Sequence, residues 1–332
     1  MAGLFVFVAA WHAPSHTVFP SARSHATFPP MTLPLPHRAA FGCMQFGGRA
    51  DDSASRAMFD ACLDAGITHF DTAHGYTEGA SETLLGQFAA PLRDRLFIAT
   101  KAGYQGGAGR ANLLAQFDES RKRLGMDTVD LLYIHRYDAD TPLDETIQTL
   151  ARLQSDGKIR QIGLSNFAAW QVMKAQAIAA RLGTRIDAIQ PMYNLVKRQA
   201  QVELLPMCAD QSIAVYGYSP LGGGLLTGKY AAGSAGRLTE DQRYAARYGQ
   251  PEMHRAAADL AVLADEVAIN AVTLAVAWVM RRGLCPILSA RSADQLAPSL
   301  AALTFTPDDA LDSRLTALAP NPPPATDRLE EA

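Results

Sequence analysis

From position 39 onward, short apolar runs alternate with longer stretches in which apolar residues recur at helical spacing. The apolar runs predict strands at Ala39–Phe46, Ile67–Asp71, Leu96–Lys101, Val129–His135, Ile159–Ser165, Ala188–Pro191, Ala214–Tyr218 and Pro286–Ser289. The stretches between and after them predict helices at Asp52–Ala65, Ser81–Ala89, Asn112–Leu124, Leu143–Ser155, Trp170–Arg181, Val202–Gln211 and Asp294–Leu303. Strands that alternate with helices indicate a parallel sheet, and eight such units predict an α/β fold, the (β/α)8 or TIM barrel.

The alternation breaks after the seventh predicted strand. The segment Leu221–Gln250 is rich in Gly and Ala and carries scattered charge, which predicts a long loop. Two further helices, Met253–Glu266 and Val272–Arg282, are expected before the eighth strand. Long loops in compact domains are usually functional or mobile, and this one leaves the carboxyl-terminal face on which barrel active sites lie. We therefore expect it to border the site.

The two ends of the chain differ from the barrel pattern. Near the start, the apolar run Leu4–Trp11 is too short to span a bilayer. A typical secretion signal has a Lys or Arg before its apolar run, and here none precedes it. A secretion signal stays an alternative. We interpret residues 1–30 as an irregular extension that need not belong to the native start. Residues 31–319 are then one barrel domain, and the Pro-rich residues 320–332 a disordered tail.

Composition narrows the class of protein. The chain has 332 residues, 48% of them hydrophobic, and a net charge of −3 with acids and bases well mixed. The sequence contains no basic block that would predict a nucleic-acid partner, and its composition gives no indication of a membrane partner. The four cysteines are scattered without a CxxC pair, which argues against disulfides or zinc and favours a reducing compartment. We expect a cytoplasmic protein without a metal, as a monomer or weak homo-oligomer.

Reactive side chains stand at the ends of three successive predicted strands. Asp71, Lys101 and His135 close the second, third and fourth strands, and Tyr76 follows Asp71 by five residues. A barrel brings these ends to one mouth, where a charged residue needs a partner, so Asp71 and Lys101 are expected to pair. The Lys101 ammonium is expected to lower the Tyr76 pKa from roughly 10, which makes the phenol a usable general acid. His135 is positioned to hydrogen-bond a carbonyl oxygen.

Taken singly, each of these four residues has an ordinary structural explanation. Asp71 could cap a turn, Tyr76 could be a loop aromatic, Lys101 a solvated strand end and His135 a core histidine. Their joint placement at consecutive strand ends favours a catalytic site.

Six short motifs strengthen this interpretation. They are DTAHGY from Asp71, TKAG from Thr100, LLYIHRYD around His135, GLSNF from Gly163, QPMYN from Gln190 and YSPLGGG from Tyr218. Together they resemble the aldo-keto reductase superfamily over about residues 31–303. The resemblance implies a (β/α)8 barrel that reversibly reduces aldehydes or ketones with NADPH. It implies Tyr76 as the proton donor, supported by the other three strand-end residues.

The resemblance also implies the cofactor site. In this sequence its positions are Cys43, Met44, Ser165, Asn166, Gln190, Tyr218, Ser219, Pro220, Leu221, Gly223, Ser289, Arg291 and Gln295. The first six would surround the nicotinamide, with Tyr218 stacked on its ring, and the next four the pyrophosphate. The planar guanidinium of Arg291 would hydrogen-bond the 2′-phosphate, with Ser289 and Gln295 assisting, and would so favour NADPH over NADH. The sequence departs from the family at Pro298-Ser299, where a Glu-Asn pair is common, so weaker use of NADH stays open.

Three alternatives remain at this point. Some relatives of this superfamily are potassium-channel β-subunits, which act as cofactor-binding regulatory partners. A sugar or aldose dehydrogenase would use the same site in the oxidative direction. A metal-dependent barrel enzyme is disfavoured because Lys101 would repel a cation between Asp71 and His135. The carbonyl substrate is open among small aldehydes, sugars, pyridoxal-like aldehydes and quinones, because it depends on loops around His74, Tyr104, Tyr137, Tyr193 and Leu221–Gln250.

Overall fold

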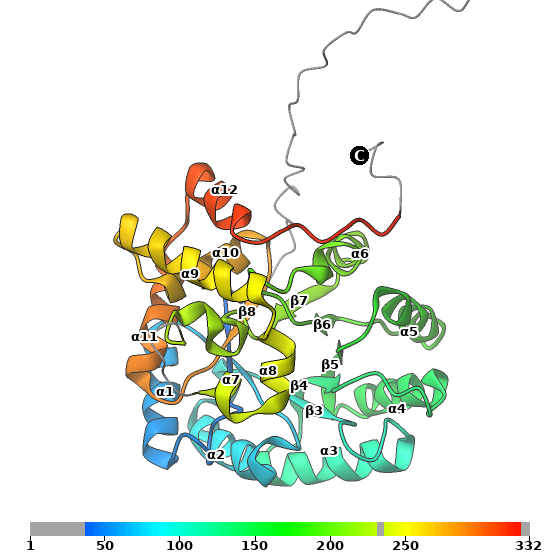
Figure 1. Ribbon diagram of the computed structural model, residues 1–332. Helices are drawn as coiled ribbons and strands as arrows, with labels where there is room; N and C mark the ends of the chain where they lie inside the picture. The colour runs from blue at the N-terminus through cyan, green and yellow to red at the C-terminus, as the bar shows by residue number, and fades with distance from the viewer. Residues whose placement is uncertain (1–36, 231–235, 327–332) are drawn as a thin grey trace, which may run out of the picture.

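The computed structural model describes residues 37–230 and 236–326, and the predicted extension at residues 1–30 lies outside them. Eight parallel strands follow one another in chain order and close into a barrel, which confirms the predicted fold (Figure 1). The strands are β1 Ala40–Gly42, β2 His69–Asp71, β3 Phe97–Ala102, β4 Val129–Ile134, β5 Ile159–Ser165, β6 Ala188–Gln190, β7 Ala214–Gly217 and β8 Cys285–Leu288.

Helices surround the barrel. The crossover helices of the outer ring are α1 Asp52–Asp64, α2 Ala80–Ala89, α3 Arg110–Leu124, α4 Leu143–Ser155, α5 Ala169–Arg181 and α6 Leu204–Gln211, with α11 Ala293–Ala301 after β8. The segment between β7 and β8 contains α7 Arg237–Glu240, α8 Gln242–Tyr248, α9 Pro251–Glu266 and α10 Ala271–Arg281, and α12 Asp309–Ala317 follows the last strand. Short 3-10 helices are η1 Tyr76–Gly79, η2 Ala90–Arg95, η3 Gln199–Gln201, η4 Gly222–Thr227 and η5 Ala302–Thr304.

The apolar spacing explains how a crossover helix attaches to the barrel. In α4, the buried residues Leu143, Ile147, Leu150 and Leu153 recur every three or four positions and therefore share one face. Burying such a side chain contributes about 1.5–3 kcal/mol each. Acidic residues in the first turn and Arg152 in the last turn complement the helix dipole. The sequence pattern thus specifies both the helix and the face that it buries.

Strand alternation places the reactive side chains inside the barrel. Ala99 of β3 belongs to a small cluster within the barrel, whereas its neighbour Ile98 belongs to the cluster under the helices. Successive side chains point to opposite faces, so Lys101 points inward like Ala99. The same alternation in β2 separates Phe70, which packs under the helices, from Asp71. Inward residues at the last positions of these strands therefore meet at the carboxyl end of the barrel.

The segment after β7 differs from the predicted irregular loop. It forms η4 and then the short helices α7 and α8, and residues 231–235 lie outside the described part. The Asp241 carboxylate caps α8 by accepting from the Arg243 backbone amide at 2.9 Å, and Tyr248 at its end is fully buried. A cap and one buried aromatic stabilise a helix too short to show apolar periodicity. Strand β1 is also shorter than predicted, because the chain turns where Phe46 donates to the Cys43 carbonyl oxygen.

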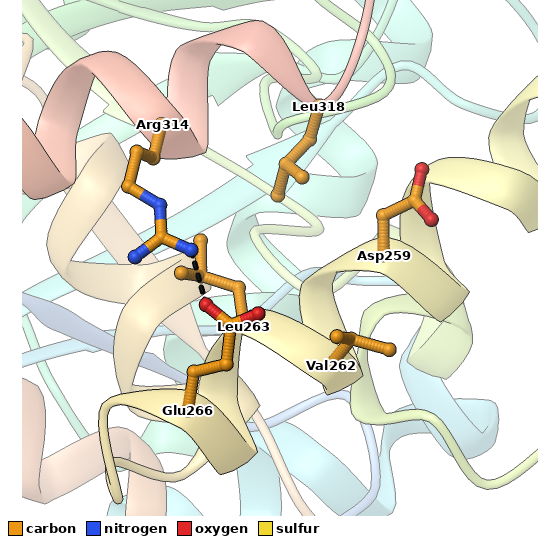
Figure 2. A pocket seen from close by; sticks show the side chains of 6 residues that line it. All are labelled: Asp259, Val262, Leu263, Glu266, Arg314 and Leu318. Carbon is orange, nitrogen blue, oxygen red and sulfur yellow. Dashed lines mark hydrogen bonds and ion pairs between the residues drawn. The ribbon is translucent and has the colours of Figure 1, made fainter.

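The carboxyl-terminal segment packs back onto the barrel (Figure 1). Arg198, which is 5% exposed, donates to the carbonyl oxygens of Thr316 and Ala319 and to Asn321 Oδ1, at 2.7–3.0 Å. The predicted disordered tail from position 320 is therefore anchored at its start, while residues 327–332 lie outside the described part. Between α9 and α12 lies a small groove of about 140 Å³, crossed by the ion pair of Arg314 with Glu266 (Figure 2).

Among residues 37–230 and 236–326, no single helix is long and apolar enough to cross a membrane. Helices α9 and α10 would pass such a test together by length and composition, although they meet at a bend of 104°.

Candidate active site

A cavity of about 940 Å³ opens at the carboxyl end of the barrel. Strand ends form its floor, and the segment after β7 forms part of its wall. Sixteen of the seventeen residues predicted for the site line it, namely Met44, Asp71, Tyr76, Lys101, His135, Ser165, Asn166, Gln190, Tyr218, Ser219, Pro220, Leu221, Gly223, Ser289, Arg291 and Gln295. Cys43 does not, because its side chain is fully buried and its thiol faces the Phe41 carbonyl oxygen.

Asp71 and Lys101 form the buried ion pair that the sequence predicted. The Lys101 ammonium contacts Asp71 Oδ1 and also donates to the Thr72 carbonyl oxygen at 2.8 Å. The second carboxylate oxygen of Asp71 accepts from Gln190 Nε2 at 2.8 Å. Burial raises the pKa of Asp71 and outweighs the lowering by Lys101 and Gln190. For Lys101, burial lowers the pKa, but Asp71 and Tyr76 together raise it above its usual value, so the ammonium persists.

Tyr76 lies over this ion pair. The Lys101 ammonium is 5.0 Å from the centre of the Tyr76 ring, and the His135 ring lies edge-on at 5.8 Å between centroids. Burial raises the pKa of Tyr76, whereas the charge and hydrogen bond of Lys101 lower it. Burial is the larger effect, so the pKa lies above its usual value, and the expected net lowering is wrong. The phenol therefore holds its proton at neutral pH.

His135 is a neutral imidazole. Burial lowers its pKa to about 3, and the nearby cations Lys101 and Arg136 add to this effect. Its Nδ1 is buried and has no hydrogen-bond partner among the described residues. A neutral imidazole carries one N–H donor and one acceptor nitrogen. The ring can therefore donate one hydrogen bond to an oxygen in the cavity without adding charge.

A connected set of polar groups occupies the ends of β5 and β6. Asn166 Nδ2 donates to the His135 carbonyl oxygen at 2.9 Å and to Ser165 Oγ at 3.0 Å, and Ser165 Oγ donates to the Gln190 carbonyl oxygen at 2.9 Å. The Tyr218 hydroxyl donates to Asn166 Oδ1 at 2.7 Å, and burial raises its pKa to about 12. Asn166 has a positive φ of 58°, a strained conformation that often marks functional sites.

The other end of the cavity lies at the start of α11. Arg291 lines it, and its side chain has no hydrogen bond or ion pair with any described residue. The backbone amide of Arg291 donates to Gln295 Oε1 at 2.8 Å, while Ser292 caps the helix by accepting from the Gln295 amide. Ser289 Oγ is buried without a partner in the described part of the chain. An unpaired guanidinium, an unsatisfied hydroxyl and a helix N-terminus together suit a phosphate group.

A fit to a dinucleotide is supported by the shape and chemistry of the cavity. Its volume lies within the range of small-molecule and cofactor sites. It contains the partly exposed ring of Tyr218 at one end and, at the other, the guanidinium of Arg291, which has no partner among the described residues. Glycines 222–224 line or adjoin the wall between these ends with positive φ angles, so their backbone can approach a ligand closely.

The sequence reasoning missed several cationic residues of the cavity wall, namely Arg49, Arg136, Lys229, Arg243 and Arg247. Arg49, before α1, forms an ion pair of 2.7 Å with Glu240 of α7, which lies 191 positions later. The Arg136 guanidinium lies 4.8 Å from the centre of the Tyr104 ring. Arg49, Arg136 and Lys229 are single cations in loops, and Arg243 and Arg247 lie in the short helix α8. Only the closed barrel brings the five together, so no local pattern could have identified them.

Comparisons with known proteins agree with this geometry. A model of the "Aldo/keto reductase family" matches residues 38–318. The human "Aflatoxin B1 aldehyde reductase member 2" is 39% identical over 230 residues, which are 67% of this chain, and the chain spans only 63% of the human protein's length. A rice "Probable voltage-gated potassium channel subunit beta" is 34% identical, covering 70% of this chain and 76% of its own length.

The Bacillus subtilis "Uncharacterized oxidoreductase YrpG" is 31% identical over 307 residues, covering 86% of this chain and 93% of its own length. The family match extends over the whole barrel, including every strand and every residue of the cavity wall. The chain therefore belongs to the aldo/keto reductase family.

Proposed function

We propose that this protein reduces an aldehyde or ketone to an alcohol with NADPH, and that Tyr76 donates the proton. The observation that carries the proposal is the position of Tyr76, a protonated phenol between the Lys101 ammonium and the neutral His135 at the floor of the cavity. The family match and the aldehyde reductases among the relatives support the reaction class.

The chain's own residues account for the proton movement. The chemistry that NADPH would supply when bound is the hydride for the carbonyl carbon. His135 donates a hydrogen bond to the carbonyl oxygen and orients it toward Tyr76, whose hydroxyl transfers its proton as charge develops on that oxygen. The Lys101 ammonium, balanced by Asp71, stabilises the phenolate that remains. The raised Tyr76 pKa keeps the donor protonated beforehand, and the same groups serve alcohol oxidation in reverse.

The polar groups of the cavity suit the two ends of NADPH. Ser165, Asn166, Gln190 and Tyr218 line the same part of the cavity, where the first three would hold the nicotinamide carboxamide and Tyr218 would stack on the ring. The guanidinium of Arg291 and the hydroxyl of Ser289, neither of which has a partner among the described residues, suit the 2′-phosphate. We therefore propose NADPH as the preferred cofactor and NADH as the weaker one.

The test is the substitution Tyr76→Phe, assayed by NADPH oxidation with a panel of short aldehydes. Loss of a general acid typically costs about 10²- to 10⁴-fold in turnover, and we expect a loss in this range with NADPH binding retained. The control is Tyr137→Phe. The sequence placed Tyr137 in a substrate loop, but in the structure it does not line the cavity and packs on Phe167 and Trp170, so loss of its hydroxyl should leave turnover unchanged.

Two results would contradict the proposal. Unchanged turnover of Tyr76→Phe would exclude this residue as the donor. A wild-type chain that binds NADPH tightly but oxidises it with no carbonyl compound would instead favour a cofactor-binding regulatory role, as the printed name of the rice relative suggests for that protein.

A further inference from the structure

The loop that carries Tyr76 has an uncommon backbone conformation. Directly after the tyrosine, Thr77, Glu78 and Gly79 have positive φ angles of 45°, 54° and 97°. Residues with a Cβ avoid this left-handed region, so two in succession persist only where neighbouring contacts hold them. The Thr77 hydroxyl provides one such contact, since it donates to the Phe46 carbonyl oxygen at 2.8 Å. A second set of contacts comes from α3.

Arg123, in the last turn of α3, contacts the loop on both sides of Tyr76. Its Nη1 donates to the carbonyl oxygen of His74, two residues before the tyrosine, at 2.9 Å. Its guanidinium also packs directly on Gly79, three residues after the tyrosine, because a Cβ there would lie 2.5 Å from Arg123 Cζ. The guanidinium therefore spans the backbone segment whose path determines where the Tyr76 side chain lies.

Two carboxylates fix this guanidinium. Arg123 Nη2 donates to Glu119 Oε1 at 2.5 Å, and Nη1 lies 3.3 Å from Oε2 of Glu82, whose side chain is fully buried. The other oxygen of Glu82 accepts from the Thr100 hydroxyl at 2.6 Å. Thr100 immediately precedes Lys101 in β3. These contacts connect the loop to the strand that carries the lysine.

His74 adds a further link between the same elements. Its Nε2 lies 2.7 Å from Glu119 Oε2, so Glu119 contacts both Arg123 and the loop. The carboxylate is half exposed, and the contribution of this pair to stability is therefore small. The pair instead helps to position the loop, because it adds a side-chain contact at His74 to the backbone contact that Arg123 makes there.

We propose that Arg123 is a positioning residue, which holds the hydroxyl of Tyr76 against the ammonium of Lys101. The inference rests on the proposed function, in which that contact stabilises the phenolate. Arg123 lies behind the cavity wall and acts through the backbone of the loop, not on the substrate or the cofactor. A guanidinium is suited to this role because its several N–H groups can donate hydrogen bonds to a carbonyl and two carboxylates at once.

The first test is Arg123→Lys, which keeps a positive charge beside buried Glu82 but loses the planar fork. A misplacement of about 1 Å can cost about 10²-fold in rate, and we expect kcat with a neutral short aldehyde to fall by that factor. The Kd for NADPH and the KM of the aldehyde should change little. The alkaline midpoint of kcat should move to higher pH, because a Tyr76 held farther from Lys101 loses the cation that lowers its pKa.

The second variant is Glu82→Gln combined with Arg123→Met, which removes both charges and leaves no buried charge unpaired. We expect the same loss of kcat and the same shift of the midpoint. Turnover is expressed per NADPH site, counted by fluorescence titration, so that unfolded protein does not affect it. The matched control Arg121→Met removes another cation of α3, paired with Asp118 and Asp127, and should change neither quantity.

The outcomes separate the two hypotheses. If both Arg123 variants have a lower Tm but unchanged kcat per site and an unchanged alkaline midpoint, Arg123 is only structural and the inference is overturned. If the wild-type chain binds NADPH and reduces no carbonyl compound, the proposed function fails, and this inference fails with it.

Discussion

At the scale of single residues, burial determines the protonation states of the site. It raises the pKa of Tyr76 against the opposing effect of Lys101, and it lowers the pKa of His135 to about 3. Both shifts favour the uncharged form, as expected when a group is removed from water. Tyr76 and His135 are consequently both able to donate at neutral pH, and Lys101 and Asp71 carry the charges of the site as a pair.

The substitution Arg291→Ala tests whether this single residue determines the preference for NADPH over NADH. The Arg291 guanidinium has no ion-pair or hydrogen-bond partner among the described residues, so Arg291→Ala breaks no internal contact of that group. A hydrogen bond to a charged group contributes about 1.5–3 kcal/mol, which predicts roughly 10- to 100-fold weaker NADPH binding. NADH lacks the 2′-phosphate, and its Kd should be unaffected. Equal weakening of both cofactors, measured by fluorescence titration, would show that Arg291 does not discriminate between them.

At the scale of elements, a helix could be predicted from the sequence where its apolar pattern was long and was missed where that pattern was short. Helix α4 could be predicted because its apolar residues repeat along a helix of thirteen residues, and Asp71 and Lys101 could be paired because their strands are neighbours. Helix α8 was missed because a cap at Asp241 and one buried tyrosine leave no period to detect. The contact of Arg123 with Glu82 joins residues 41 positions apart and depends on how α3 meets α2. Contacts of this kind arise from packing, and a single sequence does not encode them locally.

Two arginines interact at helix α12 and the residues after it: Arg198 is buried and contacts this segment, and Arg314 is exposed and belongs to it. Arg198→Lys should destabilise the fold by about 1–3 kcal/mol, because the buried hydrogen bonds to Thr316, Ala319 and Asn321 cannot all be made by an ammonium. Arg314→Lys in the groove of Figure 2 is the control. That arginine is half exposed, and its pair with Glu266 should contribute about 0–1 kcal/mol. Urea unfolding measures both, and equal effects would contradict the anchoring role of Arg198.

At the scale of the whole molecule, the barrel interior contains titratable groups that the proposed reaction does not use. His69 of β2 is 1% exposed, and neither ring nitrogen has a hydrogen-bond partner among the described residues. It packs against the rings of Phe97 and Tyr216, at 4.6 and 4.7 Å between centroids. Burial, followed by the charges of His37 and Lys101, lowers its pKa well below the usual value of 6.5. The folded chain therefore keeps this histidine neutral where the unfolded chain protonates it.

The stability of the protein should consequently fall in mild acid. For a histidine whose folded pKa is lowered, the stabilisation is fully present above the unfolded pKa and is lost as the pH falls below 6.5 toward the folded pKa. In that window each such group contributes a slope of about 1.4 kcal/mol per pH unit in the free energy of unfolding. His69→Leu removes one group, so its slope between pH 6 and pH 5 should be smaller than that of the wild type by nearly this amount. Urea unfolding at several pH values measures the difference, in which effects of other titrating groups cancel. Parallel slopes would mean that the unfolded chain takes up no proton at His69, and that another group causes any acid sensitivity.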